Sequence, residues 1–103
     1  MAKVIDDSEF LTLKLSILEK VGALHGDIRV LKSNLVAIQT AENPWRSTIL
    51  RGIRAPGTGI PFVILLGTMR VKRRKDFTAI YRRGAVDIYT FKDSDFERWI
   101  ISQ

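Results

Sequence analysis

Three glycines, two prolines and two arginines fall within the eleven residues from Arg51 to Pro61. Such a composition excludes a helix interior or a central strand, so we predict a loop of fixed shape. Its N–H groups, helped by Arg51 and Arg54, have the chemistry to bind a phosphate. However, the stretch lacks the Gly-Lys-Ser/Thr ending of a Walker loop, and Gly57 and Gly59 alone fall short of a dinucleotide fingerprint. The favoured interpretation is therefore a structural connection whose glycines take positive φ.

A second concentration of charge lies in the hairpin expected around residues 70–76. The favoured interpretation is a solvated turn that keeps the sheet edge from aggregating. The alternatives are anionic lipid headgroups, at about 1 kcal/mol per basic residue, and, more weakly, nucleic acid, since the nearby aromatics Phe77 and Tyr81 are expected in the core. The candidate binding residues of the loop and the hairpin are Arg51, Arg54, Arg70, Lys72, Arg73, Arg74 and Lys75.

Catalytic and metal chemistry find little support in the sequence. The chain has no cysteine and one histidine, His25, which leaves only carboxylates to complete a metal site. We expect His25 to meet the terminal carbonyls of a short helix. The acidic clusters near residues 6–9 and 93–97 lack calcium-loop spacing. We therefore predict neither an enzyme nor a cofactor nor a metal site.

The 103 residues correspond to one domain, with a flexible N-terminus over residues 1–8 and the folded unit over 9–103. Residues 46–83 contain ten basic side chains and a single acidic one, Asp76, so the net charge of +6 is concentrated in the middle of the chain. We see no signal peptide, and the longest apolar run is far shorter than the ~20 residues that span a bilayer. A cytoplasmic protein is expected, with peripheral membrane association as the alternative.

The hydrophobic pattern predicts an all-β domain with one short helix. Leu11, Leu13 and Leu15 alternate with polar residues, as in a half-buried strand. Ser16 and Glu19 then form a capping-box pattern, which predicts a short helix over 16–24 with Gly26 as its stop. Further strands are predicted over 28–31, 35–40, 62–71 (the central strand), 77–81, 85–91 and 96–103. Seven short strands with tight turns indicate an antiparallel barrel or sandwich.

Three segments carry a family resemblance: Leu18–Val30, Asn43–Trp45 and Leu50–Pro61, joined by Gly67-Thr68 and Lys75-Asp76-Phe77. Together they resemble a family of small uncharacterised bacterial proteins with a pleckstrin-homology-like (PH-like) domain. The resemblance covers about residues 9–103. It implies an open barrel of about seven antiparallel strands, but the C-terminal helix that closes a PH-like barrel is missing before Gln103. The family brings no known activity, substrate or cofactor.

These observations lead to two hypotheses about function. The first is a non-catalytic interaction module that forms homo-oligomers through the uncapped end of the barrel, because an uncovered apolar end favours self-association. The second is binding of a polyanion, either anionic lipid headgroups or nucleic acid, by the basic middle of the chain.

Overall fold

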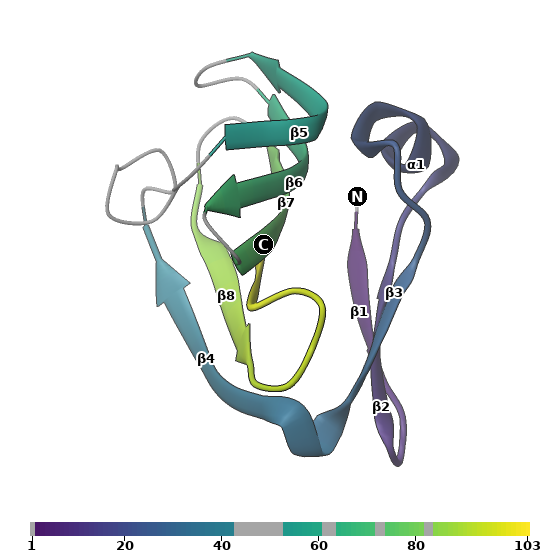
Figure 1. The fold of residues 1–103 in the computed structure, drawn as a ribbon, viewed down its shortest axis with the longest axis vertical. Helices are drawn as coiled ribbons and strands as arrows, with labels where there is room; N and C mark the ends of the chain where they lie inside the picture. Colours follow the sequence, from purple (N-terminus) through teal and green to yellow (C-terminus); the bar gives the residue numbers. More distant parts are fainter. Residues whose placement is uncertain (1, 43–52, 61–63, 72–73, 82–83) are drawn as a thin grey trace.

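The computed structural model describes residues 2–42, 53–60, 64–71, 74–81 and 84–103, and for residues 53–60 and Val71 we describe the backbone alone. The predicted site residues Arg51, Lys72 and Arg73 lie outside the described residues. The described chain forms nine strands, an α-helix and a 3₁₀ turn (Figure 1). In chain order these are β1 (Lys3–Asp6), β2 (Phe10–Lys14), α1 (Ile17–Ala23), β3 (Ile28–Leu31), η1 (Lys32–Asn34), β4 (Leu35–Ala41), β5 (Ile53–Ile60), β6 (Ile64–Val71), β7 (Arg74–Tyr81), β8 (Val86–Phe91) and β9 (Arg98–Ser102).

The N-terminal third forms a three-stranded antiparallel sheet in the order β1-β2-β3. The predicted alternation holds, since Leu11, Leu13 and Leu15 are buried. The predicted flexible N-terminus over residues 1–8 is wrong in part, because Lys3–Asp6 form β1 and pair with β2. The strand was not predicted because the segment is polar. An edge strand needs few apolar side chains, since its backbone is paired on one side only.

The remaining strands form a six-stranded sheet in the order β4-β8-β9-β7-β6-β5. β9 lies between β8 and β7 and runs parallel to β7, while the other neighbours are antiparallel. The fold is thus mostly β with one helix, as predicted. The predicted open barrel of about seven antiparallel strands differs in detail, because the described residues form nine strands in two sheets and β9 is parallel to β7. These sheets form no closed barrel, and the PH-like identity stays a prediction.

The segment η1 carries the chain from one sheet to the other (Figure 1). The sequence predicted two successive short strands around residues 32–34, and both strands form. They belong to different sheets, so this turn is a crossover connection rather than a hairpin.

The prediction of a loop in the Gly/Pro-rich stretch was wrong for its described residues, because Ile53–Ile60 form the edge strand β5. The pairing of β5 with β6 shifts register between Arg54 and Gly57, at the position of Pro56. A bulge on an edge strand is where a sheet accommodates proline. The predicted central strand, β6, is consequently second from the edge. Its Gly67 takes a φ of 128°, which a side chain rarely adopts.

The main core lies between the two sheets. Leu13 and Ile28 of the small sheet meet Phe77, Trp99 and other residues of the large one. A second apolar cluster lies on the opposite face of the large sheet and is built from Leu65, Met69, Ile80, Val86, Ile88 and Ile100. No helix among the described residues has both the length and the apolar character to cross a membrane.

Candidate interaction surfaces

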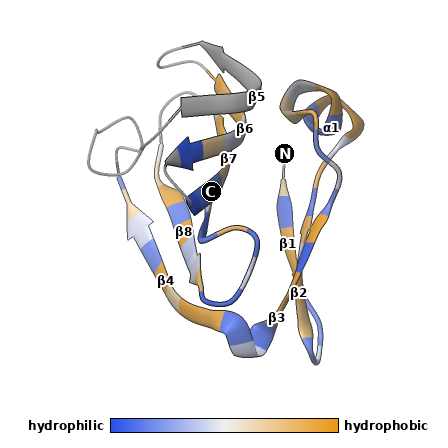
Figure 2. Ribbon diagram, viewed as in Figure 1, coloured by the Kyte–Doolittle hydropathy of each residue, from blue (hydrophilic) through white to orange (hydrophobic). Residues whose placement is uncertain are grey.

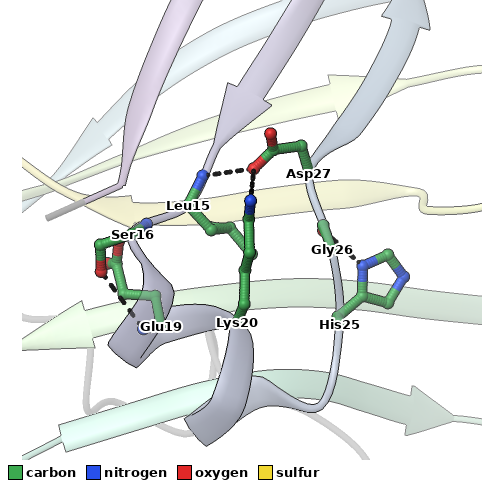
Figure 3. Close-up of polar contacts among 7 residues, drawn as sticks. All are labelled: Leu15, Ser16, Glu19, Lys20, His25, Gly26 and Asp27. Atoms are coloured by element: carbon green, nitrogen blue, oxygen red, sulfur yellow. Dashed lines mark hydrogen bonds and ion pairs between the residues drawn. The ribbon is translucent and has the colours of Figure 1, made fainter.

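Helix α1 begins at the capping box that the sequence predicted (Figure 3). The Ser16 hydroxyl accepts a hydrogen bond from the Glu19 N–H at 3.2 Å, and the Glu19 carboxylate accepts one from the Ser16 N–H at 2.9 Å. The helix ends at Leu24, whose φ of 53° is left-handed, and not at the predicted stop, Gly26. The two ends fix a helix of only seven residues, which is too short to be stable without its attachment to the sheets.

The attachment of α1 uses a buried carboxylate. Glu19 is only 2% exposed, and its carboxylate accepts a hydrogen bond of 2.5 Å from the hydroxyl of Tyr81 on β7. Burial raises the pKa of Glu19, but hydrogen bonds from Ser16 and Tyr81 outweigh burial and lower the pKa below its ordinary value. Burial and the neighbouring Glu19 carboxylate raise the pKa of Tyr81. The pair therefore consists of a carboxylate and a neutral phenol.

The apolar stripe of α1 faces solvent. Glu19 and Ala23 are the buried residues of the helix, at spacing i and i+4. The apolar side chains occupy the opposite side, so the helix buries its carboxylate and exposes its aliphatic residues. In Figure 2 the helix α1 lies at the periphery of the molecule and much of its ribbon has the hydrophobic colour. The exposed fractions are 79% for Ile17, 83% for Leu18, 67% for Val21 and 67% for Leu24.

The segment after α1 is held in place by Asp27 and His25 (Figure 3). The Asp27 carboxylate accepts a hydrogen bond from the Leu15 N–H at 2.7 Å and lies 3.8 Å from the Lys20 ammonium. The His25 ring lies 2.7 Å from the Gly26 carbonyl through Nδ1, which is beyond α1 and is not one of the terminal helix carbonyls that the sequence predicted. His25 also packs edge-on against Phe77 and Phe96, with ring centroids 5.5 Å apart in each pair.

A cleft of about 420 Å³ runs along β3. One wall is the strand itself, and the opposite wall is the segment between β8 and β9. The side chain of Asn34 ties this segment to η1, 3.5 Å from the Asp93 carbonyl and 3.4 Å from the Ser94 hydroxyl. The cleft is lined by Phe10, His25, Asp27, Ile28, Arg29, Val30, Leu31, Asn34, Lys75, Asp93, Ser94, Asp95 and Phe96.

β3 presents a strand edge to this cleft, because β3 is the outer strand of its sheet. The Lys32 N–H donates to the Glu9 carbonyl at 2.8 Å. In an antiparallel ladder this bond fixes which residues turn their backbone groups to the partner strand. Val30 and Ile28 therefore bond toward β2, whereas the N–H and C=O groups of Arg29 and Leu31 point away from β2.

The predicted basic hairpin is divided between the two faces of the large sheet. In the register of β6 with β7, Arg70 is opposite Lys75, so these two share one face, and Arg74 belongs to the other face. The Arg74 guanidinium lies 3.6 Å from the Glu97 carboxylate, and the Lys75 ammonium lies 4.8 Å from the Phe96 ring centroid. Arg54 is on β5 at the register position of Met69. Of the described side chains, Arg70 and Lys75 are thus on one face and Arg74 on the other, and binding by the whole predicted set stays a prediction.

Sequence reasoning missed a buried ion pair on β7 and β9. Asp76 and Arg98 are opposite each other in the parallel ladder. Nε and Nη2 of Arg98 donate to one carboxylate oxygen of Asp76 at 3.1 and 2.6 Å. The side chains are 1% and 14% exposed. The only available signal was a single acidic residue in a basic region, and its partner became identifiable once β9 was known to lie beside β7.

Comparison with known proteins finds no matching protein family, no matching curated protein and no matching solved structure. The resemblance to a PH-like bacterial family therefore stays a prediction. The function has to be argued from the surfaces described above.

Proposed function

We propose that the protein is a non-catalytic interaction module that self-associates through the exposed apolar face of α1. The observation that carries this proposal is the orientation of the helix, which turns Ile17, Leu18, Val21 and Leu24 to solvent while it buries Glu19. An exposed cluster of large aliphatic side chains on one short element is typical of a protein–protein contact.

A second copy of the chain is the occupant that we propose for this face. A two-fold axis through α1 would place the same four side chains of both copies against each other. Burying a large aliphatic side chain contributes about 1.5–3 kcal/mol, so eight such residues, each about three-quarters exposed, contribute roughly 9–18 kcal/mol. Association costs about 4–15 kcal/mol, and the midpoints of the two ranges differ by about 4 kcal/mol, which corresponds to a dimer with a Kd of about 1 mM.

The charges of the helix permit this approach. Lys20 is the one exposed charged residue within α1, and Asp27 lies 3.8 Å from its ammonium. Two copies would therefore meet without a row of like charges opposing each other. The proposed contact uses α1, where exposed aliphatic side chains are described, and self-association through the open end of a barrel stays a prediction.

Polyanion binding by the basic middle of the chain stays a prediction, as does the cytoplasmic location. Among the described residues, Arg74 is engaged by Glu97, and Arg70 and Lys75 are on the opposite face from Arg74. This division favours the α1 surface over the basic residues as the main contact.

Sedimentation velocity from about 10 µM to about 1 mM tests self-association over the range in which the energy balance places it. We expect the sedimentation coefficient to rise with concentration, and Leu18→Gln with Val21→Gln to abolish the rise. The matched control is Val36→Gln, which changes an apolar residue of β4 that is 61% exposed and should leave the rise intact. A monomer of 11.7 kDa at every concentration, or dissociation by the control variant alone, would refute the proposal.

A further inference from the structure

The structure assigns a second binding site to the cleft beside β3. We propose that it takes an extended peptide segment of another protein, which adds to the free edge of β3 as a strand and carries a lysine or arginine opposite Asp93 and Asp95. This site lies apart from the α1 face and does not depend on self-association.

The backbone of β3 supplies the first part of the argument. The register with β2 leaves the N–H and C=O groups of Arg29 and the N–H of Leu31 directed away from the sheet. Arg29 offers a donor and an acceptor and Leu31 offers a donor, while the Leu31 carbonyl accepts the first hydrogen bond of η1; donors and acceptors at alternate residues are what an added strand uses. Peptide recognition by strand addition draws its affinity from such main-chain hydrogen bonds.

The opposite wall of the cleft determines which partner fits. The residues from Asp93 to Phe96 face β3 across about 420 Å³, and Asn34 fixes them to η1. Because this wall lies across the cleft from β3, we infer a single extended chain as the partner, rather than a whole sheet from a second copy. The volume lies within the range of about 300–1,000 Å³ that is usual for ligand sites.

The side chains of the cleft determine the chemistry of the peptide. Ile28, Phe96 and the half-buried His25 provide an apolar lining for one side chain of the ligand. Asp93 and Asp95 are exposed carboxylates, and no cation within the described ranges forms an ion pair with either of them. The two cations of the lining, Arg29 and Lys75, lie over the rings of Phe10 and Phe96. Opposite charge on the ligand is therefore favoured at the wall that carries Asp93 and Asp95. A peptide that alternates apolar and basic residues satisfies both features, because alternate side chains of a strand point to opposite sides.

Leu31 permits a sharp test of the strand addition. Its φ is −68°, which is the value that proline imposes, and its N–H points away from β2. Leu31→Pro should therefore keep the fold while it removes one donor from the free edge. Leu31→Ala is the matched control, since it removes the same side chain and keeps the N–H.

The probe is the peptide acetyl-Val-Lys-Val-Lys-Val-Lys-amide, titrated to about 1 mM against the ¹⁵N-labelled protein by NMR. We expect shifts at residues 28–31 and 93–96, an affinity loss of about tenfold with Leu31→Pro, and a loss of at most about threefold with Leu31→Ala. The same peptide with N-methylated valines should lose binding to the unmodified protein, which tests the proposal even if Leu31→Pro fails to fold. Asp93→Asn with Asp95→Asn should weaken binding and reduce its salt dependence. Three results would each overturn the proposal: no shifts at about 1 mM, shifts confined to α1, or equal binding of the N-methylated peptide.

Discussion

Replacing Tyr81 with phenylalanine deletes the hydroxyl that joins the large sheet to α1 through Glu19. The carboxylate is 2% exposed, so water cannot fully replace the lost donor. A hydrogen bond to a charged group contributes about 1.5–3 kcal/mol, and we expect Tyr81→Phe to lower the free energy of unfolding by about 2 kcal/mol at pH 7. For a domain of this size, that loss corresponds to a decrease in Tm of roughly 10 °C.

The pH dependence distinguishes this mechanism from a simple packing defect. The pKa of Glu19 is lowered in the folded state, so its contribution to stability is present above the unfolded pKa of about 4.3 and is lost as the pH falls through the folded pKa. Tyr81→Phe removes one of the causes that lower this pKa. The stability difference between the unmodified protein and the variant should therefore be full at pH 6–7 and shrink, to about 1 kcal/mol, as the pH falls below about 4.

The opposite end of the pH range tests the phenol. The pKa of Tyr81 is raised in the folded state, so its contribution is complete below the unfolded pKa of about 10 and is lost as the pH rises toward the folded pKa. Tyr81→Phe should lack this alkaline loss, although Tyr89, whose pKa is also raised, should retain its own.

The assay is urea unfolding followed by tryptophan fluorescence at a series of pH values, with Tyr81→Phe, Glu19→Gln and the double variant. A coupling energy of at least about 1 kcal/mol between the two positions is expected from the cycle. Additive effects, or a stability difference that stays constant between pH 3 and pH 7, would refute the assigned roles of carboxylate and phenol.

Two further stability predictions follow from the described packing. Arg98→Met removes the guanidinium from the buried Asp76 carboxylate and should lower the free energy of unfolding, measured in urea, by about 3 kcal/mol. The double variant Asp76→Leu with Arg98→Met should recover most of this loss. A loss below about 1 kcal/mol for the single variant would contradict the buried pair. Leu13→Ala creates a cavity between the sheets and should lower Tm by roughly 10 °C or more. Leu18→Ala, on the exposed face of α1, should change Tm by only about 2 °C in dilute solution. Equal effects of the two variants on Tm would contradict the orientation of the helix.

Local patterns predicted most of the elements. The alternation from Leu11 to Leu15 marked β2, because one face of that strand is buried and the other is not. The Ser16 and Glu19 spacing marked the start of α1, because the capping box is a local hydrogen-bond pattern. The strands β7 and β8 and the final strand were found in the same way.

The order of the strands could not be obtained from such patterns. The insertion of β9 between β7 and β8 depends on long-range pairing, and its side chains alternate in the same way in a parallel or an antiparallel ladder. The strand β5 was missed because glycine and proline usually interrupt strands, whereas an edge position with a bulge tolerates them.

The candidate surfaces were harder to predict than the fold. A sequence shows that Ile17, Leu18, Val21 and Leu24 share helical spacing, but the hydrophobic pattern alone would turn that stripe toward the core. The hydrogen-bond partner of Glu19 is Tyr81, which is 62 residues away in the sequence. This contact turns the side of the helix that carries Glu19 toward the core, and the aliphatic stripe therefore faces solvent. The basic residues are close together in the sequence, which suggests a single patch. Neighbours along a strand, such as Arg74 and Lys75, nevertheless point to opposite faces of the sheet.

The orientation of α1 links stability to the proposed contact. A seven-residue helix gains little from its own hydrogen bonds, and here its inward side offers only Ala23 and the Glu19 carboxylate for packing. The hydrogen bond from Tyr81 is therefore a principal constraint that holds Ile17, Leu18 and Val21 outward. If the helix turned over, the aliphatic residues would reach the core only by exposing Glu19 and abandoning its contact with Tyr81. The buried Glu19 carboxylate thus disfavours the orientation in which the aliphatic residues of α1 face the core. In that orientation, the apolar face that we propose for contact with a second copy would be lost.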